Sequence, residues 1–173
     1  MSKHWNTGGK IMEFASLIAE FGARYGIGEL SPDENGAVGF AVDGRQMIIQ
    51  ELSESKDVVT VSIELCDAAE KGSAIVNRLI MKANQALFLL DGMTLVLHAE
   101  TGRYCLLSRF DVASLDFAGF DEKIGRILER ADQWGQFLQR FMPVAADAEI
   151  AAGADGKTGE VPELNPPDSF LRV

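Results

Sequence analysis

The sequence predicts an α+β domain in which three helices accompany an antiparallel five-stranded sheet, in the order α-βββ-α-ββ-α. Two observations predict this class. Apolar residues recur at helical spacing in three separate segments, and the stretches between these segments alternate apolar with polar residues, as half-buried strands do. A third observation concerns function: no catalytic motif appears among these elements, which points to a protein that acts by binding.

The first helix follows a lead-in, residues 1–10, that we expect to be flexible. Its apolar residues recur at steps of three and four and give it an aromatic face. They are Ile11, Phe14, Leu17, Ile18, Phe21 and Tyr25. Gly26 and Gly28 supply the backbone freedom that ends a helix, and residues 31–36 have the composition of a loop.

Three strands are predicted next, and they form a meander. Asp43 and Gly44 separate two apolar runs. This dipeptide is a strong signal for a hairpin, because a type I′ turn needs positive φ at both central residues. After a polar break at residues 53–57, the alternation from Val59 to Leu65 marks a half-buried strand.

The second helix is predicted to run from an N-cap at Ser73 to about Leu90, before Asp91 and Gly92. Met81 and Phe88 fall outside its main apolar stripe. A helix that is apolar on more than one side either lies deep in a core or contacts two neighbours. In a chain this short, a second copy is a natural second neighbour, so the helix predicts a homodimer.

Two further strands, residues 93–99 and 104–110, flank a hairpin loop. The last helix carries an apolar seam from Phe120 to Phe141, and Pro143 is expected to end it. This seam is expected to pack on the sheet, with an intermolecular coiled coil as the alternative. Residues 144–173 lack a sustained apolar period and are predicted to be a disordered tail, so the domain spans residues 11–143.

The charge balance, 16 Lys and Arg against 26 Asp and Glu, gives a net charge of −10, which opposes binding to nucleic acid or anionic lipid. No apolar stretch approaches the roughly 18 residues that a membrane span needs, and the N-terminus lacks the apolar core of a signal peptide. We therefore expect a cytoplasmic protein. Cys66 and Cys105 show no CxxC spacing, so they are predicted to be small buried residues rather than a disulfide or metal site.

Candidate chemistry is sparse. His4 and His98 are the two histidines, and only His98, in a strand near Cys105, could serve a nucleophile. Gly22, Gly26 and Gly28 follow a helix, whereas phosphate-binding glycine loops follow a strand. We expect no enzyme activity, no cofactor and no metal. The enzyme alternative would show turnover that is lost when His98 or Cys105 is substituted.

Several short features occur in a fixed order across residues 11–143. They are Phe14, Leu17, Phe21 and Gly22 in the first helix, Tyr25 and Leu30 at its exit, residues 40–43 before a tight turn, the capped second helix, Leu95 and Leu97, residues 104–109, and Ile124 with residues 131–134. In this order they resemble the class I type III secretion chaperones, the Tir chaperone (CesT-like) family. The lead-in is not family-like, and the tail after Pro143 is longer than many members carry.

The resemblance implies a homodimer that binds an extended N-terminal segment of a secreted effector without ATP and keeps it soluble and export-competent. The dimer residues that it implies are Val76, Leu79, Ile80, Ala83, Leu87, Leu95 and Leu97. The partner-binding residues that it implies are Phe14, Leu17, Phe21, Val38, Phe40 and Met47. We expect about half of the second set to be reachable, because the first helix needs one face against the sheet. The alternative function is a regulator that sequesters a transcription factor or anti-activator on the same surface.

Overall fold

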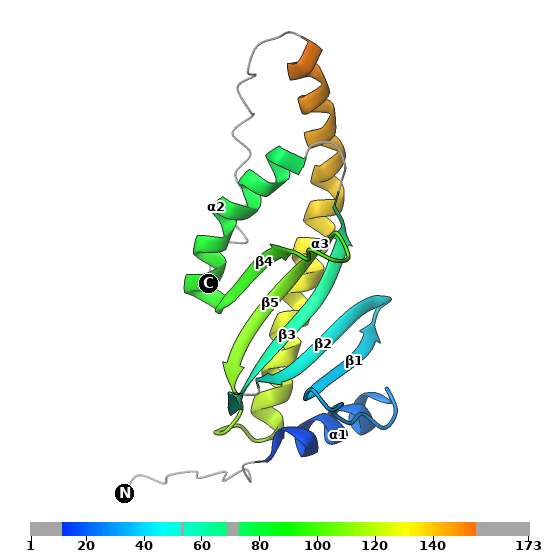
Figure 1. The fold of residues 1–173 in the computed structure, drawn as a ribbon, viewed down its shortest axis with the longest axis vertical. Coiled ribbons are helices and arrows are strands. Elements are labelled where there is room, and N and C mark those ends of the chain that lie inside the picture. The colour runs from blue at the N-terminus through cyan, green and yellow to red at the C-terminus, as the bar shows by residue number, and fades with distance from the viewer. Residues whose placement is uncertain (1–11, 53, 69–72, 155–173) are drawn as a thin grey trace, which may run out of the picture.

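A computed structural model of the chain describes residues 12–52, 54–68 and 73–154. The elements follow one another as α1 (Phe14–Tyr25), β1 (Ala37–Val42), β2 (Arg45–Leu52), β3 (Ser55–Asp67), α2 (Ser73–Asp91), β4 (Met93–Leu97), β5 (Arg103–Asp111) and α3 (Phe117–Ala154). The predicted order α-βββ-α-ββ-α is confirmed (Figure 1). The expected lead-in, residues 1–10, lies outside the described residues, as do residues 155–173 of the expected tail.

The five described strands form one antiparallel sheet in the order β1-β2-β3-β5-β4, so β1 and β4 are its edge strands. Figure 1 shows α3 running behind the sheet along β3, with α1 near the end where β1 and β2 lie and α2 beside β4. The meander β1-β2-β3 and the hairpin β4-β5 therefore meet at the β3–β5 pair.

Local turn chemistry sets the element boundaries. Asp43 and Gly44 join β1 to β2 with φ of 50° and 78°, the two positive values that a type I′ turn requires. Gly26, at φ 65°, ends α1 in the left-handed conformation, and the Ile27 N–H donates to the Gly22 carbonyl at 3.0 Å. The predicted turn and the predicted end of α1 are both confirmed. Glycine adopts a positive φ without a Cβ clash, and aspartate is among the residues that tolerate it.

The core lies between the helices and one face of the sheet. Alternate residues of each strand point into it, beginning with Val38 and Phe40 on β1 and Met47 and Ile49 on β2. Phe21 of α1 contacts Phe40 at a ring-centroid distance of 5.9 Å and Phe120 of α3 at 6.0 Å. One aromatic cluster thus joins both helices to the sheet.

The apolar seam of α3 packs inside the chain, as expected: its residues from Phe120 to Leu138 are at most 1% exposed. The expected end at Pro143 is wrong, because α3 continues to Ala154. A proline removes one helix hydrogen bond, but six of the eleven residues from 144 to 154 are alanine, the strongest helix former. Ala145 is fully buried, so packing also supports the continuation.

Candidate partner-binding surfaces

The six residues expected to bind a partner all lie in the core, with exposures of 0 to 7%. They are Phe14, Leu17, Phe21, Val38, Phe40 and Met47. Their side chains point from α1, β1 and β2 into the space between the helices and the sheet. The expectation that about half would be reachable is not met in the folded chain, because α1 needs its whole apolar face to cover β1 and meet α3.

Six of the seven residues expected at a dimer interface are also buried, at 0 to 6% exposure. They are Val76, Leu79, Ile80, Ala83, Leu87 and Leu95. These side chains belong to the core of the chain itself, where α2 packs against β4 and α3. Leu97, the seventh, is 49% exposed.

A different part of α2 is open to a second molecule. Met81, Phe88 and Leu89 are 77%, 63% and 73% exposed. Met81 and Phe88 are seven residues apart, which places them two helical turns apart on one face. Leu97 lies near this face, since it pairs with Tyr104, whose hydroxyl donates to Asn77 of α2 at 2.9 Å. The sequence indicated this exposed surface, because Met81 and Phe88 lie outside the main apolar stripe of α2.

The outer edge of β1 presents backbone groups without partners among the described residues. Asp33 occupies the outward groups of Ala37: its carboxylate accepts the Ala37 N–H at 2.8 Å, and its own N–H donates to the Ala37 carbonyl at 2.9 Å. Gly39 and Ala41 follow with the same orientation, because outward-facing residues alternate along a strand. Both are exposed, and among the described residues nothing bonds their outward N–H and C=O groups.

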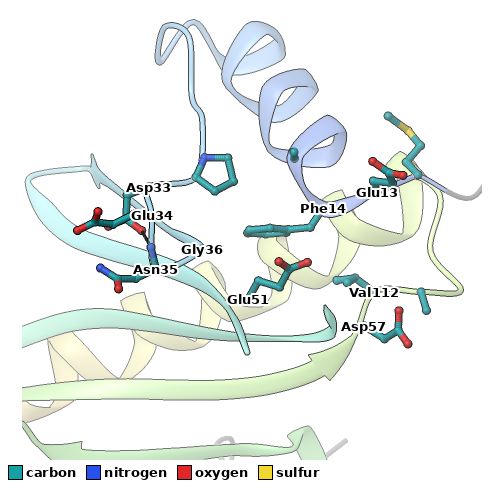
Figure 2. A pocket seen from close by; sticks show the side chains of 13 residues that line it. Glu13, Phe14, Asp33, Glu34, Asn35, Gly36, Glu51, Asp57 and Val112 are labelled. Carbon is teal, nitrogen blue, oxygen red and sulfur yellow. Dashed lines mark hydrogen bonds between the residues drawn. The ribbon is translucent and has the colours of Figure 1, made fainter. Parts of the chain in front are cut away.

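A groove of about 920 Å³ opens where α1 begins, at the end of the sheet that holds the start of β1 (Figure 2). Its wall is formed by α1, the loop before β1, the end of β2 and the start of β3. Phe14 reaches into it between Glu51 and the α1 backbone, and Val112 lies beside Asp57. The groove is therefore apolar at its base.

The rim of this groove is acidic. Its carboxylates are Glu13, Asp33, Glu34, Glu51 and Asp57, and its lining includes no lysine or arginine. Four of the five are exposed and Glu51 is half-buried, so these charges are solvated and screened by salt. The groove can accommodate a chain segment, but its carboxylates have no nucleophile or histidine among the lining residues to work with.

The described residues assemble no reactive centre. His98 is exposed, and its Nδ1 accepts the Thr101 N–H at 3.3 Å within the hairpin loop. Cys105 is 2% exposed, and burial raises the pKa of its thiol. Burial likewise raises the pKa of Cys66 to about 11, and both cysteines are free. Within residues 12–154, where described, no group of three potential ligands could hold a metal, and no helix is long and apolar enough to cross a bilayer.

Comparison with known families identifies the chain. The sequence profile of the Tir chaperone protein (CesT) family matches residues 16–135, which include most of α1, the whole sheet and most of the buried seam of α3. The chain belongs to the CesT family. The matched range ends before Pro143, so the last turns of α3 lie outside the profile of this CesT protein.

Solved structures share the fold of this CesT protein. The ExsC–ExsE complex matches with a TM-score of 0.64 at 23% identity, covering 73% of this chain and 97% of the other. The HopA1–SchA chaperone–effector complex matches with a TM-score of 0.58 at 15% identity, covering 70% and 91%. The Yersinia pestis type III secretion chaperone SycH, in complex with a fragment of YscM2, matches with a TM-score of 0.50 at 15% identity, covering 68% and 95%. No curated protein sequence matches the chain.

Proposed function

We propose that this CesT-family protein is a type III secretion chaperone that binds an extended segment of a secreted effector and keeps it soluble and export-competent without ATP. The observation that carries the proposal is the open edge of β1, at Gly39 and Ala41. Membership of a chaperone family and likeness in fold to a chaperone–effector complex support it.

An edge strand binds an extended segment through backbone hydrogen bonds, with the partner added as one more strand. Gly39 and Ala41 suit this role because they carry little or no side chain and a partner backbone can approach closely. Ile48, on the neighbouring strand opposite Gly39, is 41% exposed and offers apolar contact on the same sheet face. Backbone pairing depends little on partner sequence, so apolar contacts have to supply selectivity.

The groove extends this path at the start of β1. A segment that pairs along β1 and continues past Ala37 reaches the groove, where Phe14 offers apolar surface. Of the six expected partner-binding residues, Phe14 is the one that lines this groove, with 5% of its surface exposed. We place partner binding on the β1 edge and this groove.

We further propose a cytoplasmic homodimer in which α2 meets the α2 of a second copy. Met81, Phe88 and Leu89 on α2, together with Leu97, supply the exposed apolar surface. Large apolar side chains exposed together on one element are typical of protein interfaces. This arrangement leaves the β1 edge of each subunit accessible, because β1 and β4 lie at opposite edges of the sheet.

The test replaces Ala41 with proline and compares it with Ala41→Val. The outward Ala41 N–H makes no bond to β2, so proline removes a group that only a partner strand would use. Valine keeps the N–H and is similar in size. We expect the valine variant to retain the protein that co-purifies from the native cell and the proline variant to lose it, with unchanged circular dichroism.

The identity of the co-purified protein, established by mass spectrometry, separates the two functions expected from the sequence. A secreted effector supports the chaperone, whereas a transcription factor or anti-activator supports the regulator. Retention of the partner by a folded Ala41→Pro variant would show that the β1 edge is not the binding site.

A further inference from the structure

The second edge of the sheet, β4, is closed by a side chain. The Asn84 amide of α2 donates from Nδ2 to the Leu95 carbonyl at 2.9 Å, and its Oδ1 accepts the Leu95 N–H at 2.7 Å. These two Leu95 groups face away from β5, because β4 pairs with β5 on its other side.

Asn84 reproduces the contact that a further strand would make. In an antiparallel ladder, two opposed residues exchange both N–H···O=C bonds, and an asparagine side chain carries the same amide group as the backbone. Asn84 therefore stands where an added strand would place its pairing residue. The two edges of the sheet differ: β4 is occupied at Leu95, while no described residue occupies β1 at Gly39 and Ala41.

Because of the position of Leu95 in β4, the contact with Asn84 is enough to block the whole edge of this strand. Leu95 is the middle residue of the five-residue strand β4, and the other edge-facing residues, Met93 and Leu97, are the strand's two ends. A strand that avoids Leu95 could pair at one end only. Asn84 is also held firmly, since its neighbours on α2, Ala83 and Leu87, are 1% and 2% exposed in the core.

We propose that Asn84 is an edge-blocking residue that excludes strand addition at β4 and thereby confines it to β1. For the effector this inference rests on the proposed function: each subunit accepts one strand, at one edge. For the protein alone it means that subunits associate through the exposed face of α2 and not by pairing β4 with the β4 of a second copy. Such edge pairing is the hazard that an unprotected edge strand carries.

The test is Asn84→Leu, which keeps the side-chain size and the helix but removes both bonds. Gln139→Leu is the matched control, because Gln139 is exposed on α3 and the substitution removes an amide without touching a strand. Light scattering of the purified protein gives the mass, and amide hydrogen exchange gives the protection of the Leu95 N–H. Pairing of β4 between copies gives a species of at least twice the wild-type mass, because a dimer formed through α2 carries two β4 edges.

We expect wild type and the control to share one mass and to protect the Leu95 amide. The Asn84→Leu variant should also form the larger species, in which the second copy protects the Leu95 amide from exchange. A folded Asn84→Leu variant with the control's mass and an exposed, fast-exchanging Leu95 amide would overturn the proposal, because the edge would be open and still unused.

If Asn84→Leu fails to fold, Asn84→Ala decides by the same two measurements. Alanine is a strong helix former and has no amide, so it removes both bonds to Leu95. The larger species supports the proposal and its absence with an exposed Leu95 overturns it. Neither readout requires an effector, so failure here leaves the test at Ala41 untouched, and failure at Ala41 leaves this one untouched.

Discussion

Arg130 of α3 lies against Asp91, the last residue of α2, with 2.9 Å between Nε and Oδ2 and 3.4 Å between Nη2 and Oδ1. The side chains are 17% and 8% exposed, so the ion pair is largely removed from water. A carboxylate at a helix C-terminus is opposed by the helix dipole, and a buried one needs a counter-charge. Arg130 supplies that charge and ties the end of α2, and with it the start of β4, to α3.

We predict that Arg130→Met destabilises the chain by about 3 kcal/mol, the lower end of the range for breaking a buried pair, because Arg130 is partly hydrated. Urea unfolding monitored by circular dichroism measures this change. Arg140→Met, at an exposed position of the same helix, is the control and should change the free energy of unfolding by less than about 0.5 kcal/mol. Equal effects of the two variants would mean that the ion pair contributes nothing specific.

Two glycines in helices are predicted to respond to alanine with opposite signs. A Cβ on Gly22 of α1 would lie 2.5 Å from the Gly28 carbonyl oxygen and 2.9 Å from Cγ of Leu30, so Gly22→Ala should destabilise by about 1–3 kcal/mol. A Cβ on Gly125 of α3 meets nothing within 4 Å, and Gly125→Ala should stabilise by up to about 1 kcal/mol. Thermal unfolding of both variants measures the difference, and a stable Gly22→Ala would mean that the 26–30 segment moves away from α1.

The two thiols are predicted to react slowly in the folded protein. The pKa of Cys66 is raised to about 11 by burial and by the charge of Asp67, and the pKa of Cys105 is raised by burial. Because the thiolate is the reactive form, Cys66 modification at neutral pH should be about 100-fold slower than for a thiol of pKa 9.0. Its rate should keep rising with pH up to about 11.

The raised pKa of Cys66 also predicts how the stability of the fold changes with pH. The thiol of Cys66 loses its proton at a lower pH in the unfolded chain than in the folded one, so stability falls as pH rises from about 9 toward 11.

The variant Cys66→Ser is the control for the modification rates of the two thiols, since it should remove the slow reaction that titrates near 11. Rapid modification at neutral pH, with equal rates in folded and urea-unfolded protein, would contradict the prediction.

The sequence predicted the element order and several boundaries because these depend on local chemistry. Asp43 and Gly44 specify their turn through backbone conformation alone, and Gly26 specifies the end of α1 in the same way. Pro143 was misleading for a related reason: its local cost is real, but the alanines after it and the burial of Ala145 outweigh that cost.

The surfaces could not be predicted to the same extent. Periodicity shows that Leu79 and Phe40 are apolar, but not that other parts of the same chain cover them. Surface apolar residues were visible as exceptions to the pattern, as Met81 and Phe88 were. Asn84 carried no sequence signal, because its role depends on the alignment of α2 with β4, which only the folded chain defines.

The α2 surface leads to the last prediction, which contrasts two aspartate substitutions on one helix. Phe88 is 63% exposed, so Phe88→Asp should leave the monomer fold intact and prevent association, because a charge would be buried at the proposed interface. Leu79 is 4% exposed, so Leu79→Asp should place a carboxylate in the core and destabilise the chain by about 4 kcal/mol or more.

Light scattering at micromolar concentration and thermal unfolding together distinguish these outcomes. We expect a dimer for wild type, a folded monomer for Phe88→Asp, and an unfolded or insoluble chain for Leu79→Asp. Lys82→Asp, at an exposed position one residue beyond Met81, controls for charge and should weaken association less, since it removes no apolar side chain. A wild-type monomer at this concentration, or a Phe88→Asp variant that still forms the dimer, would exclude the exposed face of α2 as the dimer interface.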